Sequence, residues 1–143
     1  MFCIKVKGRD VTSPTSFGRL QVGEFQEDFE MDLSFWSPRD DERQWRQGLE
    51  RLVEKEGASC LISSMSRPES ANFVFLWLLY RDEDRVFVQQ FVLILDECSE
   101  AFRPEDPYRH VPSREIVSED GELVSEWKTE VSEVSRFLAE APF

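Results

Sequence analysis

Two long apolar segments, residues 73–80 and 85–95, lie close together and constrain the fold more than any other feature of this chain. Residues 73–80 (FVFLWLLY) are apolar at odd and even positions alike. Because a strand points successive side chains to opposite faces of its sheet, such a strand must be covered on both faces, at the centre of a sheet. The polar residues 82–84 (DED) separate the two segments and predict a hairpin between them.

Further strands and two helices are predicted around this hairpin. Strands are expected at residues 3–6, 20–35 and 58–65, a short hairpin at 114–128, and loops at 13–18 and 100–113. The chain has 143 residues, enough for one domain with a real core but hardly for two. We therefore predict a single α+β domain over residues 1–143: a mostly antiparallel twisted sheet with two helices packed on it.

The first helix has clear signals at its start. Ser37 can cap it, Pro38 suits its first position, and Asp40 stands three residues after the cap. Gly57 is expected to end this helix in a left-handed conformation. A second helix is expected over residues 130–140. The residues expected to face the core are Trp45, Leu49, Leu52 and Val53 in the first helix and Val131, Val134, Phe137 and Leu138 in the second.

Residues 24–36 (EFQEDFEMDLSFW) alternate between apolar and acidic side chains. On a strand this pattern turns one face to the core and sets Asp28, Glu30 and Asp32 about 6.6 Å apart on the other. These carboxylates repel one another, so folding gains nothing from the row, whereas a positively charged partner docking there would explain it. The alternative explanation is an exposed sheet edge protected by charge. Glu27 has the apolar parity and predicts a bulge or an exposed strand end.

Five other polar or aromatic positions are candidates for recognition or packing. Trp36 shares the acidic parity, so it is expected to project beside the carboxylates as an interface anchor, or else to fix the entry of the helix. Gln89 and Gln90 interrupt an apolar strand; we expect them to bond each other or a loop, or one of them to face a groove. Trp77 and Trp127 are expected in the core.

The composition favours a basic protein partner. The formal net charge is −12, with 29 acids against 17 bases, and the pI is about 4.5. A surface of this sign repels nucleic acid and anionic membranes and attracts basic proteins. Three widely spaced cysteines (Cys3, Cys60, Cys98), together with an N-terminus that lacks a secretory signal, predict reduced thiols in a cytoplasmic protein.

No catalytic constellation, metal motif or phosphate-binding glycine loop occurs in the sequence. His110 is the single histidine, and its pairing with a cysteine nucleophile is far less expected than a plain surface histidine. We therefore predict no enzyme, no metal and no cofactor. The competing hypothesis is a small metal-dependent hydrolase that uses surface carboxylates, such as the pairs Asp40/Asp41 and Glu119/Asp120.

Several segments resemble the immunity proteins of bacterial contact-dependent growth inhibition (CDI) systems. They are residues 23–37 (GEFQEDFEMDLSFWS), 44–52 (QWRQGLERL), 61–65 (LISSM), 71–81 (ANFVFLWLLYR), 86–90 (VFVQQ), 118–121 (SEDG) and 125–127 (SEW). The resemblance runs from about Gly18 to Leu138. It lies in the amino-acid sequence as a whole rather than in a catalytic or ligand-binding motif. It implies a small cytoplasmic protein that binds the toxic C-terminal domain of a large exported protein and covers its active or substrate-binding surface. The family offers no catalytic residues to transfer.

The resemblance and the acidic row together predict a stoichiometric inhibitor of a basic toxin, acting as a monomer that forms a 1:1 heterodimer. The resemblance implies that such toxins are often nucleases, and it leaves the class of this toxin open. The predicted toxin-binding residues are Glu24, Asp28, Glu30, Asp32 and Trp36. The alternative function is a small acidic adaptor or nucleic-acid mimic that binds another basic protein.

Overall fold

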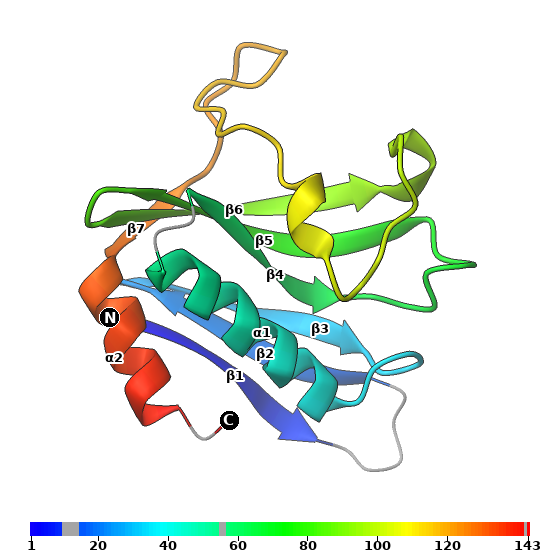
Figure 1. The fold of residues 1–143 in the computed structure, drawn as a ribbon, viewed down its shortest axis with the longest axis horizontal. Coiled ribbons are helices and arrows are strands. Elements are labelled where there is room, and N and C mark those ends of the chain that lie inside the picture. Colours follow the sequence, from blue (N-terminus) through cyan, green and yellow to red (C-terminus); the bar gives the residue numbers. More distant parts are fainter. Residues whose placement is uncertain (10–14, 55–56, 142) are drawn as a thin grey trace.

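The computed structural model describes residues 1–9, 15–54, 57–141 and 143. Its elements, in chain order, are β1 (Phe2–Arg9), β2 (Thr15–Val22), β3 (Phe25–Asp32), α1 (Pro38–Val53), β4 (Ala58–Ser64), β5 (Phe73–Asp82), β6 (Arg85–Ile94), 3₁₀ turns at Leu95–Glu97 and Pro107–His110, β7 (Trp127–Glu130) and α2 (Val131–Glu140). The strands form two antiparallel sheets, in the orders β1-β2-β3 and β4-β5-β6-β7 (Figure 1). The predicted α+β class is confirmed.

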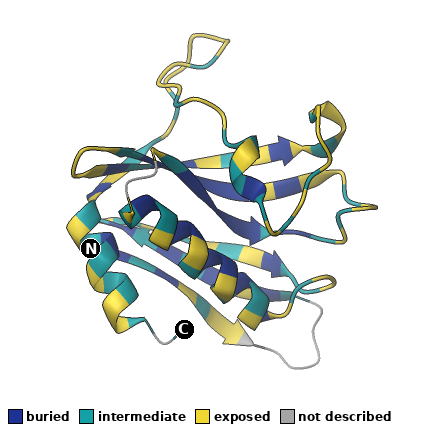
Figure 2. Ribbon diagram, viewed as in Figure 1, coloured by how far each residue is buried: buried dark blue, intermediate teal, exposed yellow. Residues whose placement is uncertain are grey.

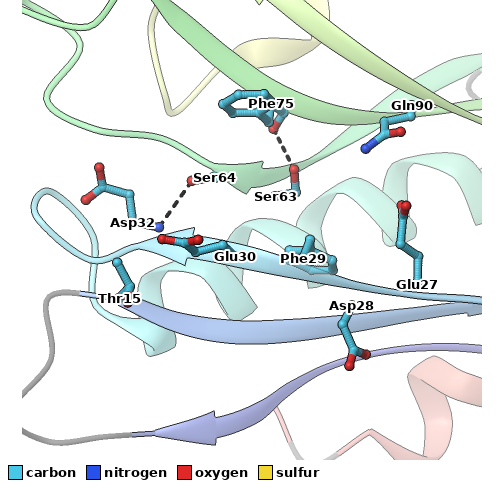
Figure 3. A pocket seen from close by; sticks show the side chains of 10 residues that line it. All are labelled: Thr15, Glu27, Asp28, Phe29, Glu30, Asp32, Ser63, Ser64, Phe75 and Gln90. Carbon is cyan, nitrogen blue, oxygen red and sulfur yellow. Dashed lines mark hydrogen bonds between the residues drawn. The ribbon is translucent and has the colours of Figure 1, made fainter.

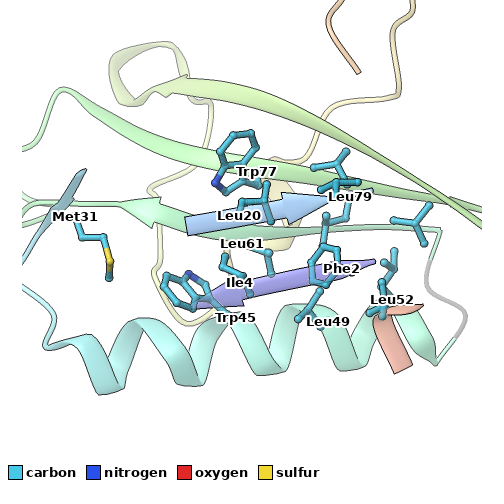
Figure 4. Close-up of a cluster of buried hydrophobic side chains, with 14 residues drawn as sticks. Phe2, Ile4, Leu20, Met31, Trp45, Leu49, Leu52, Leu61, Trp77 and Leu79 are labelled. Atoms are coloured by element: carbon cyan, nitrogen blue, oxygen red, sulfur yellow. The ribbon is translucent and has the colours of Figure 1, made fainter. Parts of the chain in front are cut away.

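The two sheets and both helices share one apolar core (Figure 4). Its buried members include Ile4, Leu20 and Met31 from the first sheet, Trp45, Leu49 and Leu52 from α1, Leu61, Trp77, Leu79 and Val88 from the second sheet, and Val134 from α2. A second cluster, which includes Ile62, Leu76 and Leu78, occupies the other face of the second sheet. The loop that follows β6 contributes half-buried residues to that cluster, among them Phe102 and Tyr108.

The central hairpin forms as predicted, with β5 and β6 paired from Phe73↔Ile94 to Asp82↔Arg85. The middle of β5, from Leu76 to Tyr80, is buried on both faces (Figure 2). The prediction is wrong at the start of β5, where Phe73 and Phe75 are exposed. Both side chains line surface hollows at this end of the strand.

Helix α1 starts as predicted and ends differently. The Ser37 hydroxyl accepts from the Asp40 backbone N–H, and the Asp40 carboxylate accepts from the Ser37 N–H, which makes a capping box. The helix ends at Val53, and Gly57 has no positive φ, so the predicted glycine cap is wrong. The last carbonyls are bonded instead by Arg81 of β5, which donates to the Leu52 and Val53 oxygens at 2.9 and 2.8 Å.

Helix α1 also covers the outer edge of β4. Gln44 donates to the Cys60 carbonyl and accepts from the Ile62 N–H, at 3.0 and 2.6 Å, while the Trp45 indole donates to the Ile62 carbonyl at 2.8 Å. Gly48 permits this approach, because a Cβ there would lie 2.4 Å from the Cys60 carbonyl oxygen. The helix thus satisfies backbone groups that a neighbouring strand would otherwise bond.

The strand predicted over residues 20–35 is wrong. The structure has a hairpin there, in which β2 and β3 pair from Thr15↔Asp32 to Val22↔Phe25. Gly23 stands first in the two-residue turn with φ +62°, a conformation that a hairpin turn of this length needs and glycine adopts without strain. The register is unbroken at Glu27, so the predicted bulge is absent there. Part of the loop predicted at 13–18 belongs to β2, and residues 13 and 14 lie outside the described residues.

The predicted hairpin over residues 114–128 is also reduced. Only one β-bridge, Val117↔Leu123, joins its two sides among the described residues. Trp127–Glu130 instead forms β7, which pairs with residues Arg85–Val88 of β6. Helix α2 then follows directly, as predicted, and buries Val134.

Candidate functional site

The first sheet carries the predicted acidic residues on its outer face, but with cations among them. Asp28 lies opposite Arg19 of β2, whose Nε donates to its Oδ1 at 2.6 Å, and Lys7 of β1 donates to its Oδ2 at 2.8 Å. The hydrogen bonds from Arg19 and then Lys7 hold the pKa of the Asp28 carboxyl well below its usual range. Asp28 is therefore largely neutralised by the protein's own side chains.

The other predicted residues lie apart from this ion pair. Glu30 is exposed on β3 and Asp32 is half-buried at its end, and neither forms an ion pair with a described residue. Glu24 lies in the β2–β3 turn and not on the strand face. The row of carboxylates is thus shorter than predicted, because the chain reverses at Gly23.

A groove follows the free edge of β3, where the two sheets separate (Figure 3). Its volume is about 460 Å³, and it is lined by Thr15, Glu27, Asp28, Phe29, Glu30, Asp32, Ser63, Ser64, Phe75 and Gln90. One end is tied together by the Asp32 N–H, which donates to the Ser64 hydroxyl at 3.1 Å. Four lining residues are acidic and none of these ten is lysine or arginine, so the groove suits a cationic group.

Glu27 points to the opposite face of β3 from Asp28 and Glu30, and the groove accounts for this position. It points from β3 towards Gln90 across the groove (Figure 3). Its Oε2 is buried and has no hydrogen-bond partner among the described residues. A buried carboxylate oxygen without a partner is costly to keep, so this atom is suited to a donor supplied by a ligand or a partner protein.

The wall of the groove is supported by aromatic side chains that pack edge-on. Phe29 packs edge-on against Trp45 and Trp77, with ring centroids 6.0 and 6.2 Å apart. Its ring also covers Gly18 on β2, where an added Cβ would lie 2.4 Å from the ring. Because both tryptophans are buried in the shared core, the position of β3 is fixed by that core.

Trp36 does not lie in this groove, contrary to its predicted position beside the carboxylates. It is half-buried, packs against the second core cluster and lines a separate hollow with Asp40, Arg43 and Pro104. The chain leaves β3 after Asp32 and turns towards α1, so the alternation that links Trp36 to the acidic residues ends before it. Its role at the helix entry fits the structure better.

The structure adds an exposed apolar strip that was not predicted as a site. It consists of Phe73, Phe75, Val92 and Ile94, which are cross-strand neighbours and 41 to 48% exposed. Phe75 also lines the groove, so the strip and the acidic lining are continuous.

The two interrupting glutamines have different partners. Gln90 lines the groove, whereas Gln89 donates to the Glu115 carbonyl and the Glu126 carboxylate on the facing loop. Trp77 is fully buried and Trp127 is half-buried against the same core, where Phe25 stacks on it.

The metal-ligating side chains and the cysteines bear on the competing hypothesis of an enzyme. Among residues 1–9, 15–54, 57–141 and 143, no cluster of three or more His, Cys, Asp or Glu side chains could hold a metal ion. Cys60 is buried and burial raises the pKa of its thiol to about 12, while Cys3 and Cys98 are half-buried and unpaired. None of the described helices is both long and apolar enough to cross a membrane.

Comparison with known proteins gives three concordant matches. The family model for the CdiI N-terminal domain matches residues 31–137. A protein from Enterobacter cloacae named "Immunity protein CdiI" is 33% identical over 143 residues, which covers 96% of each chain. The chain belongs to the CdiI immunity protein family. The predicted resemblance to CDI immunity proteins is confirmed.

A solved structure extends this agreement to the fold of CdiI. The match is to a chain of a CdiA-CT/CdiI toxin and immunity complex from Enterobacter cloacae, with a TM-score of 0.88 and 31% sequence identity. It covers 98% of this chain and 97% of the other. Both sheets and both helices described above therefore belong to a CdiI fold.

Proposed function

We propose that this CdiI-family protein binds and neutralises the C-terminal toxin domain of a CDI system by covering a basic surface of that domain. The observation that carries the proposal is the groove along β3, which runs into an exposed apolar strip. Three of its carboxylates, Glu27, Glu30 and Asp32, have no ion-pair partner among the described residues, whereas Asp28 at the rim is paired with Arg19 and Lys7. Its relatives support the partner class, since the matched structure is a toxin and immunity complex. The protein would act in the cytoplasm as a 1:1 inhibitor, without catalysis, cofactor or metal, and would bind neither nucleic acid nor membranes.

Charge supports fast recognition of such a toxin. The net charge of −12 attracts basic domains from a distance, and opposite charge raises association rates towards about 10⁸–10⁹ M⁻¹s⁻¹ at low salt. If the toxin is a nuclease, its substrate-binding surface is basic. Carboxylates at Glu27, Glu30 and Asp32 would then occupy positions that phosphates take in the substrate.

The apolar strip supports tight binding once the partners have met. Interfaces gain most of their affinity from a few buried aromatic or large apolar side chains, surrounded by polar groups that exclude water. Phe73 and Phe75 lie 6.2 Å apart between ring centroids and border the acidic lining. We therefore assign Glu27, Glu30, Asp32, Phe73 and Phe75 to the toxin-binding face. Glu24, Asp28 and Trp36 remain predicted contacts, with Asp28 at the rim of the groove.

The first prediction tests the groove by charge reversal. Glu30→Lys with Asp32→Lys is expected to lower the association rate for the toxin domain encoded directly upstream of this gene at least tenfold, because two attractive charges become repulsive. Surface plasmon resonance measures the rate, and growth of cells that express the toxin measures protection. Asp28 is left intact because its reversal would also break the Arg19 and Lys7 pairs.

A matched control separates local charge from net charge. Glu54→Lys with Glu140→Lys changes the net charge by the same amount at exposed sites outside the groove. This variant should bind and protect nearly as well as the wild type. A groove variant that binds as fast as this control would exclude the groove as the interface. Wild-type protein that fails to bind the toxin, but captures another basic protein, would instead favour the adaptor function.

A further inference from the structure

Residues 114–126 form an arm that extends from the body of the molecule between Pro112 and β7 (Figure 1, orange). The groove uses none of its residues. Three of its aliphatic side chains are largely exposed: Ile116 at 58%, Val117 at 50% and Leu123 at 78%. Exposing several aliphatic residues together at one tip has a cost in solubility, so the arm requires an explanation.

The base of the arm is held rigidly. Arg114 forms a two-pronged ion pair with Glu126, with Nε–Oε2 and Nη2–Oε1 distances of 2.8 and 2.5 Å. The guanidinium of Arg114 also lies 3.8 Å from the centre of the Phe87 ring. Gln89 donates to Glu126 and to the Glu115 carbonyl, and the Tyr80 hydroxyl donates to the Pro112 carbonyl at 2.9 Å. Residues from β5 and β6 thus fix the direction in which the arm leaves the body.

The tip of the arm is ordered by its own hydrogen bonds. The Val124 N–H donates to the Ile116 carbonyl and the Ser118 N–H to the Glu122 carbonyl, both at 2.8 Å. Gly121 turns the chain with φ +81°, and its N–H donates to the Ser118 carbonyl. An isolated two-stranded ribbon is only marginally stable in water, so a fixed base and an ordered tip lower the entropy that a binding event must remove.

The charge of the arm restricts its partner. Glu115, Glu119, Asp120 and Glu122 are exposed and form no ion pair with any described residue, and no lysine or arginine occurs between residues 115 and 126. Such a tip is repelled by anionic lipid and by nucleic acid. It suits a protein surface that offers an apolar depression surrounded by lysine or arginine.

We propose that the arm is a second docking element for the toxin domain, which inserts Ile116, Val117 and Leu123 into an apolar depression with a basic rim. This inference rests on the proposed function. Gln90 faces the groove and Gln89 holds the arm, and neighbouring residues of a strand point to opposite faces. The groove and the arm therefore lie on opposite faces of β6, so their contacts with a toxin domain can be removed one at a time.

The test compares the arm with an exposed apolar residue elsewhere. Ile116→Ser with Leu123→Ser is expected to raise the dissociation rate of the toxin complex at least tenfold, because the apolar contacts are lost. The control is Ala139→Ser, which replaces an exposed apolar residue of α2 outside the arm and the groove and should leave that rate unchanged. Hydrogen exchange at the Ser118 and Val124 amides should be slower in the toxin complex than in the free protein.

The outcomes separate this inference from the proposed function. If the wild type binds the toxin and the arm variant dissociates equally slowly, the arm inference is wrong and the proposed function stands. If the wild type does not bind, the proposed function fails. Should the substituted arm disturb folding, Glu119→Lys with Asp120→Lys in the turn provides a second variant, and binding at the wild-type rate would again overturn the inference. A free protein that dimerises through the arm would assign it to a second copy and overturn it as well.

Discussion

At the scale of single residues, this CdiI-family protein keeps several acidic side chains where folding alone would not place them. Glu27 has a buried carboxylate oxygen without a described partner, and Asp41 on α1 has another. Asp28, by contrast, is compensated by Arg19 and Lys7. Uncompensated carboxylates lower stability, so their presence at the groove is consistent with selection for binding.

Asp41 gives a prediction about pH. It is 3% exposed, and burial, with smaller contributions from Asp40 and Glu42, raises its pKa to about 8 from 3.8. Between these values the folded protein keeps a proton that the unfolded chain releases, so the free energy of unfolding should fall as pH rises from 4 to 8. Asp41→Asn should be more stable than the wild type at pH 8 by at least about 1 kcal/mol, with a smaller difference at pH 5.

Urea unfolding at the two pH values measures this difference. Glu54→Gln, at the exposed end of the same helix, is the control and should follow the wild type. A constant difference between Asp41→Asn and the wild type at both pH values would contradict the assigned protonation.

At the scale of elements, two tight hairpin turns set the register of the strands. Gly23 adopts its positive φ without strain, but Glu83 in the β5–β6 turn has φ +57°, which a side chain with a Cβ rarely adopts. The turn joins β5 and β6, the two most extensively paired strands. A shift of their register would relieve the strain at Glu83, but it would break the pairing along the whole hairpin. The strain at Glu83 is therefore held by the hairpin.

Replacing Glu83 should relieve this strain. Glu83→Gly is expected to raise the free energy of unfolding by about 0.5 to 1 kcal/mol, since the left-handed penalty exceeds the added freedom of the unfolded chain. Asp84→Gly, one residue on and without a positive φ, should lower it by a similar amount. Thermal or urea unfolding of both variants gives the comparison; equal effects would show that backbone conformation is not the cause.

How far the sequence predicts the elements depends on how local their signals are. Ser37, Pro38 and Asp40 mark the start of α1 within four residues, and that prediction is correct. The β2–β3 turn was missed although its signal was present: apolar parity changes from even at Leu20 and Val22 to odd at Phe25 and Phe29. A single strand cannot change parity in this way, so the chain must turn between Val22 and Phe25, where Gly23 has its positive φ.

The candidate site was harder to predict, because it depends on contacts between distant segments. That Arg19 and Lys7 neutralise Asp28 follows only from the register of three strands. The groove exists because β3 and β4 end two different sheets, and the exposure of Phe73 and Phe75 follows from how far the core extends. Family resemblance identified the protein class without locating any of these features.

At the scale of the whole molecule, one core holds both sheets and both helices, while the surface carries a net charge of −12. The wild type should therefore associate with a basic toxin at least tenfold more slowly when salt rises from about 50 mM to about 500 mM, because salt screens the long-range attraction. Stopped-flow measurements over this range give the slope. The Glu30→Lys, Asp32→Lys variant should show a shallower slope; a wild-type rate independent of salt would argue against electrostatic steering.

The free edge of β3 has a consequence for how the protein behaves in a crowded solution of its own copies. An unpaired strand edge is a template on which another chain can add a strand, and such contacts lead to aggregation. A second copy approaching there would set Glu30 and Asp32 against their own counterparts, and like charges at that distance oppose pairing. The same side chains can thus attract a basic partner protein and repel a second copy of this chain. The strand edge therefore stays unpaired and accessible to that partner.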